Sequence, residues 1–427
     1  MKIIYFYIAF FVCFNFDVFG FENNEEAVNF IVSVINTEGY KDDFGDNFSD
    51  LFKKHLPESK IKKVFTELKG KYGNIQRFKD INKEKGIFEV EFENIILTLS
   101  LSLDEGKINS LYFSNPRIKG SFSIDTLEKV SGEKSILLEQ LNNNKILFEY
   151  NKDLPLEISS AFKIYLLIGV IEKEKNLSKI LKLDKKYYSF PPYLLYSFPE
   201  GSPLTLYTYL FMMIAQSDNT AADHIISFLG EDNIPFLLSK YGNINYKMNI
   251  PFLYTSDLFR IFYSTYTIKE YINLSLEEKK VILNKLREDN KINSFISGKR
   301  WKEIEDVILK SNEYHTKIGW FASASDMCRA FKYIVKSKQS DKIREILGVN
   351  TDLSAASLIS DDIRERYKYL GGKIGSKYGV ISANFLIITN NDVPYCLSVT
   401  INSSKPIDYN DIYIKIISQL LNNRDIK

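Results

Sequence analysis

A serine and a lysine three residues apart are the first candidates for chemistry in this sequence. Ser160 and Lys163 stand at the start of the apolar stretch 164–170, which predicts a helix. Residues i and i+3 share one helix face, so the Lys163 amine should lie one turn from the Ser160 hydroxyl. A serine becomes a nucleophile when a nearby base takes its proton, and burial can hold a lysine neutral for that task. The pair alone does not establish function, because a serine in a first helical turn is usually a cap.

A second polar motif is the triplet Ser-Asp-Asn at 217–219. It falls in a short turn between two predicted apolar helices, 206–216 and 220–229. Such a turn often only caps the helix that follows, and we expect Asn219 and Thr220 to act as caps here.

A third motif, Lys-Ile-Gly-Ser at 373–376, lies in a predicted strand. Gly375 would let a ligand approach the backbone of the strand, and Lys373 supplies a cation. Two rival copies exist, a Ser-x-x-Lys at 131–134 and a Lys-Ile-Gly ending at residue 319. The first sits in a charged segment. We reject the second because the helix predicted after it, over 321–335, does not fit the strand context of the motif.

In this order, Ser-x-x-Lys, Ser-Asp-Asn and Lys-x-Gly resemble the class A β-lactamase and penicillin-binding-protein-like superfamily of serine hydrolases. The string Ser-Asp-Asn-Thr-Ala-Ala at 217–222 is similar to class A β-lactamases in particular, and the resemblance covers about residues 118–427. It implies an α+β fold, an α/β sandwich of an antiparallel sheet with helices. The whole chain also resembles a two-domain group of exported β-lactamase-like proteins from actinobacteria and clavulanic-acid gene clusters.

The resemblance implies a role for each motif residue. Ser160 would be the acylated nucleophile, Lys163 its base, and Ser217 a relay that passes a proton to the leaving nitrogen. Asn219 would orient Lys163 and the substrate amide. The strand motif would bind substrate: Lys373 attracts a carboxylate, Gly375 allows close approach, and the backbone N–H groups of Ser160 and Ser376 form an oxyanion hole.

Two departures from the family pattern bear on turnover. The usual threonine of the strand motif is Ile374, which removes a hydroxyl that would bind the substrate carboxylate. Class A enzymes also carry a Glu-x-x-Leu-Asn loop whose glutamate activates the deacylating water, and residues 241–251 contain no carboxylate. Glu231 and Asp232 come too early, and Asp257 lies in the next predicted helix. We therefore expect slow deacylation of β-lactams.

Three readings of the function stay open. The chain is either a serine hydrolase with β-lactam hydrolysis as the family-default reaction, or an enzyme that acylates itself with an ester or a peptidoglycan stem peptide. The third reading is a non-catalytic envelope binding protein. In each, the ligand is a small molecule or a short peptide.

The first hundred residues after the N-terminus predict a separate α+β domain. Helical periodicity over 27–35 and 61–68 is followed by period-two alternation over 88–92 and 97–103. Helices followed by an antiparallel meander resemble the cone-shaped nuclear-transport-factor-2-like (NTF2-like) fold. We assign residues 21–117 to this accessory domain, without chemistry of its own and with no partner identified.

Residues 118–427 make the second predicted domain, after a linker near residues 115–120. A helix over 124–139 and a strand near 145–150 open it, and mostly helical sequence follows, with extra helices inserted around 290–350. Three strands, near 370–376, 380–389 and 395–401, and a C-terminal helix capped by Asp408 close it. Strands at both ends imply one sheet assembled from the start and the end of the domain.

Composition narrows the possible partners. Lys+Arg 56 against Asp+Glu 54 leave a formal charge of +2, so no net field recruits nucleic acid or an anionic membrane. The three histidines and the two downstream cysteines show no metal-ligand spacing, and there is no glycine-rich phosphate loop. We expect neither a metal nor a cofactor.

The N-terminus predicts export. Lys2 precedes the apolar run 3–14, and residues 18–20 offer a cleavage site, so residues 1–20 read as a signal peptide. An uncleaved anchor and lipidation at Cys13 are alternatives. After cleavage only Cys328 and Cys396 remain, and one disulfide is possible in the periplasm or outside the cell.

Overall fold

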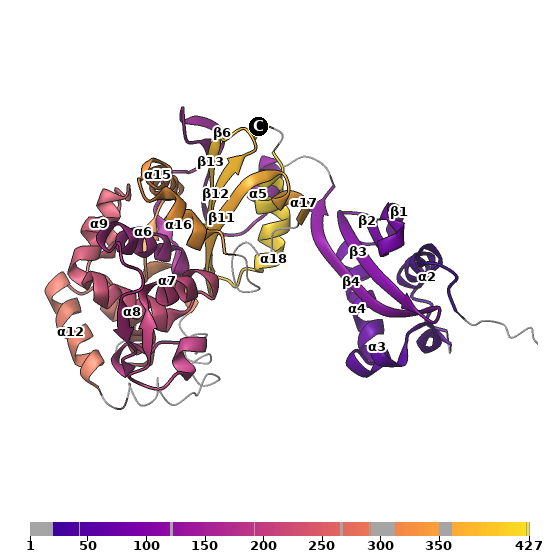
Figure 1. Cartoon of the computed structure of the whole chain (residues 1–427), viewed down its shortest axis with the longest axis horizontal. Coiled ribbons are helices and arrows are strands. Elements are labelled where there is room, and N and C mark those ends of the chain that lie inside the picture. Colours follow the sequence, from indigo (N-terminus) through magenta and orange to yellow (C-terminus); the bar gives the residue numbers. More distant parts are fainter. Residues whose placement is uncertain are drawn as a thin grey trace, which may run out of the picture. The chain divides into compact units, whose positions relative to one another are not determined.

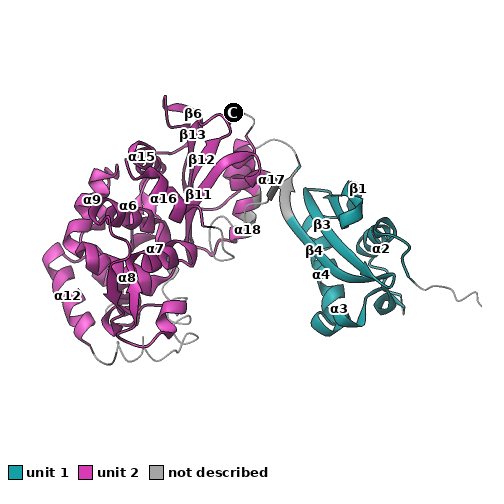
Figure 2. Ribbon diagram, in the orientation of Figure 1, with its two compact units in different colours: residues 1–121 teal, residues 122–427 magenta. Residues whose placement is uncertain are grey.

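The computed structural model describes residues 20–41, 43–119, 123–191, 193–264, 268–289, 291, 312–349, 361–423 and 425–426. The chain divides into two compact units, residues 1–121 and 122–427, coloured teal and magenta in Figure 2. The expected signal peptide, apart from Gly20, lies outside the described residues. No helix in the described part of the chain is both long and apolar enough to cross a bilayer.

Unit 1 places helices before a meander of strands, in the order that the sequence predicts. Its helical segments are α2 (Asn24–Thr37), η1 (Phe44–Asn47), α3 (Asp50–His55), α4 (Glu58–Tyr72) and η2 (Lys83–Lys85). Its strands are β1 (Ile75–Asn82), β2 (Ile87–Phe92), β3 (Ile95–Asp104) and β4 (Lys107–Ile118), antiparallel in the order β1-β2-β3-β4. Strand β1 was not predicted, because its mostly exposed residues show no apolar alternation. The assignment to the NTF2-like fold stays a prediction.

The core of unit 1 follows directly from the alternation in its sequence. In β2, Phe88, Val90 and Phe92 are buried while the glutamates between them are partly exposed. Side chains on one strand point alternately to the two faces, so one face packs on the helices and the other meets solvent. The Asn23 side chain caps α2 by accepting from the backbone N–H groups of Glu25 and Glu26.

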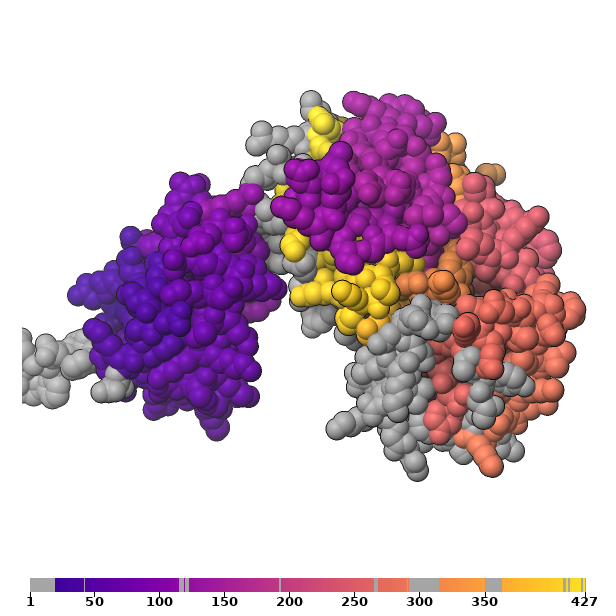
Figure 3. Space-filling model, turned by 180° about the vertical axis from the view of Figure 1, so that it is seen from behind, coloured from indigo at the N-terminus to yellow at the C-terminus, as the bar shows by residue number. Residues whose placement is uncertain are grey.

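Unit 2 is built around a five-stranded antiparallel sheet in the described residues, in the order β11-β12-β13-β5-β6. The strands are β5 (Glu133–Gln140), β6 (Lys145–Tyr150), β11 (Tyr367–Lys377), β12 (Val380–Thr389) and β13 (Pro394–Asn402). Strands β13 and β5 pair directly, so the sheet joins the two ends of the unit as predicted. Figure 3 shows this union on the surface, where purple residues from the start of the unit adjoin yellow residues from its end.

One prediction in this unit was wrong. Residues 124–139 do not form a helix: a short helix α5 (Ile124–Glu128) ends before Gly132, which has φ +107°, and strand β5 follows. β5 is central in the sheet, and Ser135 to Leu138 are all buried. A strand covered on both faces carries a continuous apolar run, which periodicity alone cannot distinguish from a buried helix.

Helices and short strands fill the rest of unit 2. The helices are α6 (Lys163–Lys173), α7 (Leu206–Ala215), α8 (Asn219–Leu229), α9 (Ile234–Lys240), α10 (Thr255–Tyr263), α11 (Ile268–Ile272), α12 (Leu276–Glu288), α15 (Ala324–Lys336), α16 (Ser340–Leu347), α17 (Asp361–Arg364), α18 (Tyr409–Ile412), the π-helical η10 (Tyr413–Ile417) and α19 (Ser418–Leu421). The 3-10 turns are η3 (Ser159–Phe162), η4 (Lys185–Tyr187), η5 (Leu194–Ser197), η6 (Glu231–Asn233), η7 (Tyr246–Asn249) and η8 (Asn312–Lys317). The short strands are β7 (Leu156–Glu157), β8 (Ile180–Lys182), β9 (Pro203–Thr205) and β10 (Phe321–Ala322).

These helices cover both faces of the sheet. Figure 1 shows α6, α15 and α16 on one side and α5, α17 and α18 on the other. Helix α15 begins at the capping box of Ser323 and Asp326, within the predicted range 321–335, although residues 321–322 form strand β10 rather than helix. Cys328 of α15 and Cys396 of β13 form a disulfide, with their Cα atoms 5.5 Å apart. Part of the helical insert predicted around 290–350 lies outside the described residues, namely 290, 292–311 and 350.

Candidate active site

Ser160 lies in a tight turn rather than at the start of the α-helix that the sequence predicts. Residues Ser159–Phe162 form the 3-10 turn η3, and α6 begins only at Lys163. Ser159 has φ +47°, a left-handed conformation that is uncommon for serine, and the Ile158 N–H donates to the carbonyl of Trp320 at 2.8 Å. The chain therefore bends sharply as it leaves β7, and Ser160 sits at the bend.

The Lys163 amine is the centre of the site. Its Nζ lies 3.2 Å from Ser160 Oγ and 3.3 Å from Ser217 Oγ. It also donates to the Ser217 carbonyl at 2.7 Å and to Asn219 Oδ1 at 2.6 Å. Lys163 is fully buried, and in the described residues these four oxygens are the hydrogen-bond partners of its amine. Two of the three sequence motifs thus meet at one nitrogen.

The electrostatic surroundings favour the neutral form of Lys163. Burial lowers the pKa of the Lys163 amine well below its usual value, and the positive charge of Lys373 lowers it further. Asp218 and Asp223 act in the opposite direction, with smaller effect. A neutral amine beside a hydroxyl can accept its proton, which is the condition for an activated serine.

The Ser-Asp-Asn turn is capped differently from the prediction. Asp218, and not Asn219 or Thr220, is the N-cap of α8: its Oδ1 accepts from the Ala221 N–H at 2.8 Å. Its Oδ2 accepts from the Leu195 N–H at 3.1 Å. The cap frees the Asn219 side chain, which bridges Lys163 and the carbonyl of Phe190. Ser217 has φ +54°, so this turn is strained where it reaches the lysine.

The strand motif lies at the edge of the sheet beside the serine turn. A Cβ at Gly375 would stand 2.7 Å from the backbone nitrogen of Ser160 and even closer to the Ile158 carbonyl, so no larger residue fits. The Ser376 carbonyl accepts a hydrogen bond from Ser159 Oγ at 3.1 Å. Lys373 is buried and donates to its neighbour's carbonyl, and burial lowers its pKa to about 7.

The rival motifs do not form comparable sites. Lys134 donates to the Gly132 carbonyl two residues away, and Ser131 is exposed. The copy ending at Gly319 leads into β10 and α15. The carboxylate of Glu231 is bound by Arg287 at 2.9 Å, and the same guanidinium binds Asp257 at 2.7 Å. Glu231, which comes too early in the sequence for the glutamate of the class A loop, is therefore engaged in an ion pair.

The stretch 241–251 is fixed by asparagines. Asn243 and Asn249 both donate to the carbonyl of Phe321, and Asn245 donates to Asp326 at 2.7 Å. These side chains hold the loop against β10 and the start of α15. This stretch contains no carboxylate, so it offers no counterpart of the glutamate that activates water in class A enzymes.

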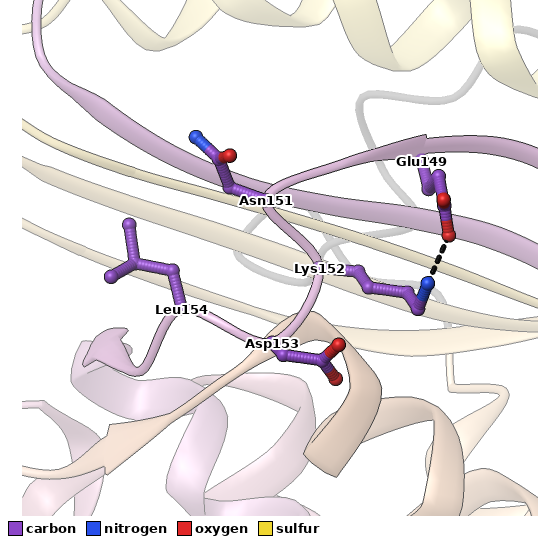
Figure 4. A pocket seen from close by; sticks show the side chains of 5 residues that line it. All are labelled: Glu149, Asn151, Lys152, Asp153 and Leu154. Atoms are coloured by element: carbon purple, nitrogen blue, oxygen red, sulfur yellow. Dashed lines mark hydrogen bonds and ion pairs between the residues drawn. The ribbon is translucent and has the colours of Figure 1, made fainter.

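A separate depression lies on the loop between β6 and β7. It is lined by Glu149, Asn151, Lys152, Asp153 and Leu154, and Figure 4 shows Glu149 and Lys152 paired across it. It is open and polar, and none of these residues belongs to the Ser160 cluster. We assign no chemistry to it.

The sequence did not indicate two groups of the site. Asp218 was named only as part of its motif, and its capping and loop contacts depend on the tertiary fold. Glu157 and Lys377, a buried ion pair next to the serine turn, were not singled out. A charged residue in the apolar stretch 154–158 is the signal that would have found Glu157.

A serine–lysine pair on an α+β unit of this kind defines a β-lactamase-like serine hydrolase. Residues 122–424 match the model of the beta-lactamase enzyme family, and the chain belongs to that family. No curated protein matches the chain.

Solved structures with similar folds include β-lactamases. Those from Sphaerobacter thermophilus and Chitinophaga pinensis are each 16% identical, with TM-scores of 0.44 and 0.43. Each match covers 70% of this chain, and 92% and 94% of the two enzymes respectively. The structure of PBP-A is 14% identical, with a TM-score of 0.45 over 70% of this chain and 93% of that chain.

Proposed function

We propose that this protein is an exported serine hydrolase that forms an acyl-enzyme on Ser160 and reacts with β-lactams. The observation that carries the proposal is the buried Lys163 amine, which lies 3.2 Å from Ser160 Oγ and has no carboxylate in hydrogen-bonding contact among the residues that the structure describes. Lys163 takes the hydroxyl proton while Ser160 attacks the lactam carbonyl. Ser217, at 3.3 Å from the same amine, passes a proton to the leaving nitrogen.

Substrate binding falls to the edge strand. Lys373 attracts the substrate carboxylate, and the backbone N–H groups of Ser160 and Ser376 stabilise the oxyanion of the tetrahedral intermediate. The close approach of the Gly375 backbone to the Ser160 nitrogen supports this arrangement.

Release of the acyl group is the slow step. Residues 241–251 lack a carboxylate, and Glu231 is held by Arg287, so among the described residues of the site we assign the role of base for water to Lys163. A bulky β-lactam acyl group hinders water at that face, whereas an acetyl group leaves it open. Small esters are therefore a second candidate substrate class.

Burst kinetics test the proposal. With a penicillin we expect one equivalent of β-lactam rings to open per enzyme in a burst, because the opened ring stays bound to Ser160, followed by a slow steady state. With an aryl acetate we expect steadier turnover, and Ser160→Ala should abolish both. Rapid, burst-free penicillin hydrolysis with no esterase activity would contradict the slow-release step. Activity that survives in Ser160→Ala would contradict the nucleophile assignment.

Export is a proposal that rests on two features. The N-terminal twenty residues carry a signal-peptide pattern, and Cys328 and Cys396 are bonded, which is typical of oxidising compartments. Fractionation of the native host with the mature N-terminus sequenced would test it, and an uncleaved protein in the reducing cytosol would contradict it.

A further inference from the structure

An ion pair between a buried carboxylate and a partly buried lysine lies beside the serine turn, and the acylation steps above do not use it. Glu157 ends β7, three residues before Ser160, and Lys377 follows Ser376 at the end of β11. The Lys377 Nζ lies 3.1 Å from Glu157 Oε1, and the Glu157 side chain is fully buried. The pair joins the two segments that carry the two backbone N–H groups of the proposed oxyanion hole.

Both partners are themselves fixed by backbone contacts. The Asn402 side chain accepts from the Glu157 N–H and donates to the Glu157 carbonyl, each at 2.9 Å. The Trp320 N–H donates to Glu157 Oε1 at 3.3 Å, and Lys377 Nζ donates to the Ile318 carbonyl at 2.6 Å. Neither side chain can move away without breaking these contacts. The pair can therefore fix the distance between the end of β7 and the end of β11.

Gly319 makes the room that the pair occupies. Its φ of +134° suits glycine, and a Cβ there would collide with Glu157 Oε1 and stand 3.1 Å from Lys377 Nζ. A second link runs parallel to the pair, since Ser159 Oγ donates to the Ser376 carbonyl at 3.1 Å. Two separate contacts therefore connect the serine turn with the same end of β11.

Stability alone does not explain the pair. Burial raises the pKa of the Glu157 carboxyl and lowers the pKa of the Lys377 amine, so both charges are disfavoured where they stand. Glu157 Oε2 is buried and has no hydrogen-bond partner in the described part of the chain. Apolar residues of similar volume often replace such a pair without loss of stability, whereas a pair with fixed contacts specifies a geometry.

We propose that Glu157 and Lys377 are a positioning pair, which sets the spacing between the Ser160 and Ser376 amides and thereby the strength of the oxyanion hole. This inference rests on the acyl-transfer function proposed above. The pair touches no substrate; it acts through the two backbone segments that it ties together.

Glu157→Gln and Lys377→Met, in the full chain, test the role. Each variant should lower the rate constant of Ser160 acylation by about 10- to 100-fold, the scale on which small misplacements of reacting groups act. The dissociation constant of the initial non-covalent complex should change less than about threefold, because the ligand contacts remain. The double variant should lose less than the product of the two single losses, since both remove one interaction.

Two further measurements separate positioning from simple destabilisation. Asp257→Asn removes the charge of another buried carboxylate, which pairs with Arg287 and Arg260, and serves as the matched control. It should leave the acylation rate unchanged even where it lowers the unfolding temperature. Amide hydrogen exchange should rise in Glu157→Gln within peptides covering 156–163 and 373–379, and stay unchanged there in the control.

The outcomes are distinct. Acylation of Glu157→Gln at the wild-type rate, or an equal slowing in Asp257→Asn, would overturn the positioning role. If neither penicillin nor a fluorophosphonate labels the wild type, the proposed function fails. In that case the hydrogen-exchange measurement still tests whether the pair positions the two segments, because unchanged exchange in both peptides of Glu157→Gln would refute that role.

Discussion

The pKa of Lys373 leads to a prediction that separates charge recognition from chemistry. Burial lowers this pKa to about 7, so raising the pH from 6 to 8 removes most of the positive charge from the empty site. With a pKa of about 7, about nine-tenths of the molecules carry the charge at pH 6 and about one-tenth at pH 8. The acylation rate constant for a substrate with a carboxylate should therefore fall about tenfold relative to a neutral substrate.

The ratio of two substrates isolates this effect. Deprotonation of Lys163 changes the nucleophile for every substrate, so it cancels when a penicillin is compared with an uncharged aryl ester on the same enzyme. The assay is the second-order acylation rate constant for each substrate, from pH 5.5 to 8.5. In Lys373→Met the ratio should be low and independent of pH. A wild-type ratio that stays constant across this range would refute the assignment of Lys373 as the carboxylate-binding cation.

The remaining predictions concern the base, the buried polar groups, the disulfide and the domain boundary. Lys163→Ala should slow acylation by about 10²–10⁴-fold in stopped-flow measurements, and a loss below about tenfold would exclude it as the base. The folded pKa of Asp223 is raised to about 6 by burial, from 3.8, so its stabilising contribution is present at low pH and is lost as the pH rises from about 4 to 6. Relative to Asp223→Asn, the wild type should lose up to about 3 kcal/mol of unfolding free energy over that range by urea titration, and a constant difference would contradict this. Cys328→Ala should lower the unfolding free energy by about 2–4 kcal/mol, and an unchanged value after reduction of the wild type would show that the disulfide adds nothing. A truncated variant starting at Ile118 should keep the acylation rate, and a folded variant that cannot be acylated would show that unit 1 contributes to the site.

Local sequence patterns were sufficient where turn residues mark the ends of a mostly apolar stretch. Strand β12 spans 380–389, the range predicted, because Gly379 with φ +67° marks its start and its residues, all of them buried, are mostly apolar. The polar motifs were visible because Ser160 and Lys163 are close in sequence. The resemblance implied that they would meet Ser217 and the strand motif. In the structure, Ser160, Ser217 and Asn219 all contact the Lys163 amine.

Features that depend on long-range packing were missed. Residues 133–139 were predicted to be helical because this strand, covered on both faces, shows no alternation of apolar and polar residues. Its pairing with β13 and β6, which makes it a strand, cannot be seen in the local sequence. The pair of Glu157 with Lys377 joins residues 220 positions apart in the sequence (377 − 157), so no local pattern could connect them. The cap of α8 was assigned to the wrong residue because Asp, Asn and Thr are all good caps, and only the backbone geometry at Ser217 selects Asp218.

The most direct test of the central claim is the intact mass of the protein followed over time with a penicillin, with peptide mapping of the adduct. The account predicts a single adduct with the mass of the whole penicillin, on Ser160, which forms fast and decays slowly. An adduct on another serine such as Ser131, or none at all while a fluorophosphonate still labels Ser160, would contradict β-lactam acylation at this site.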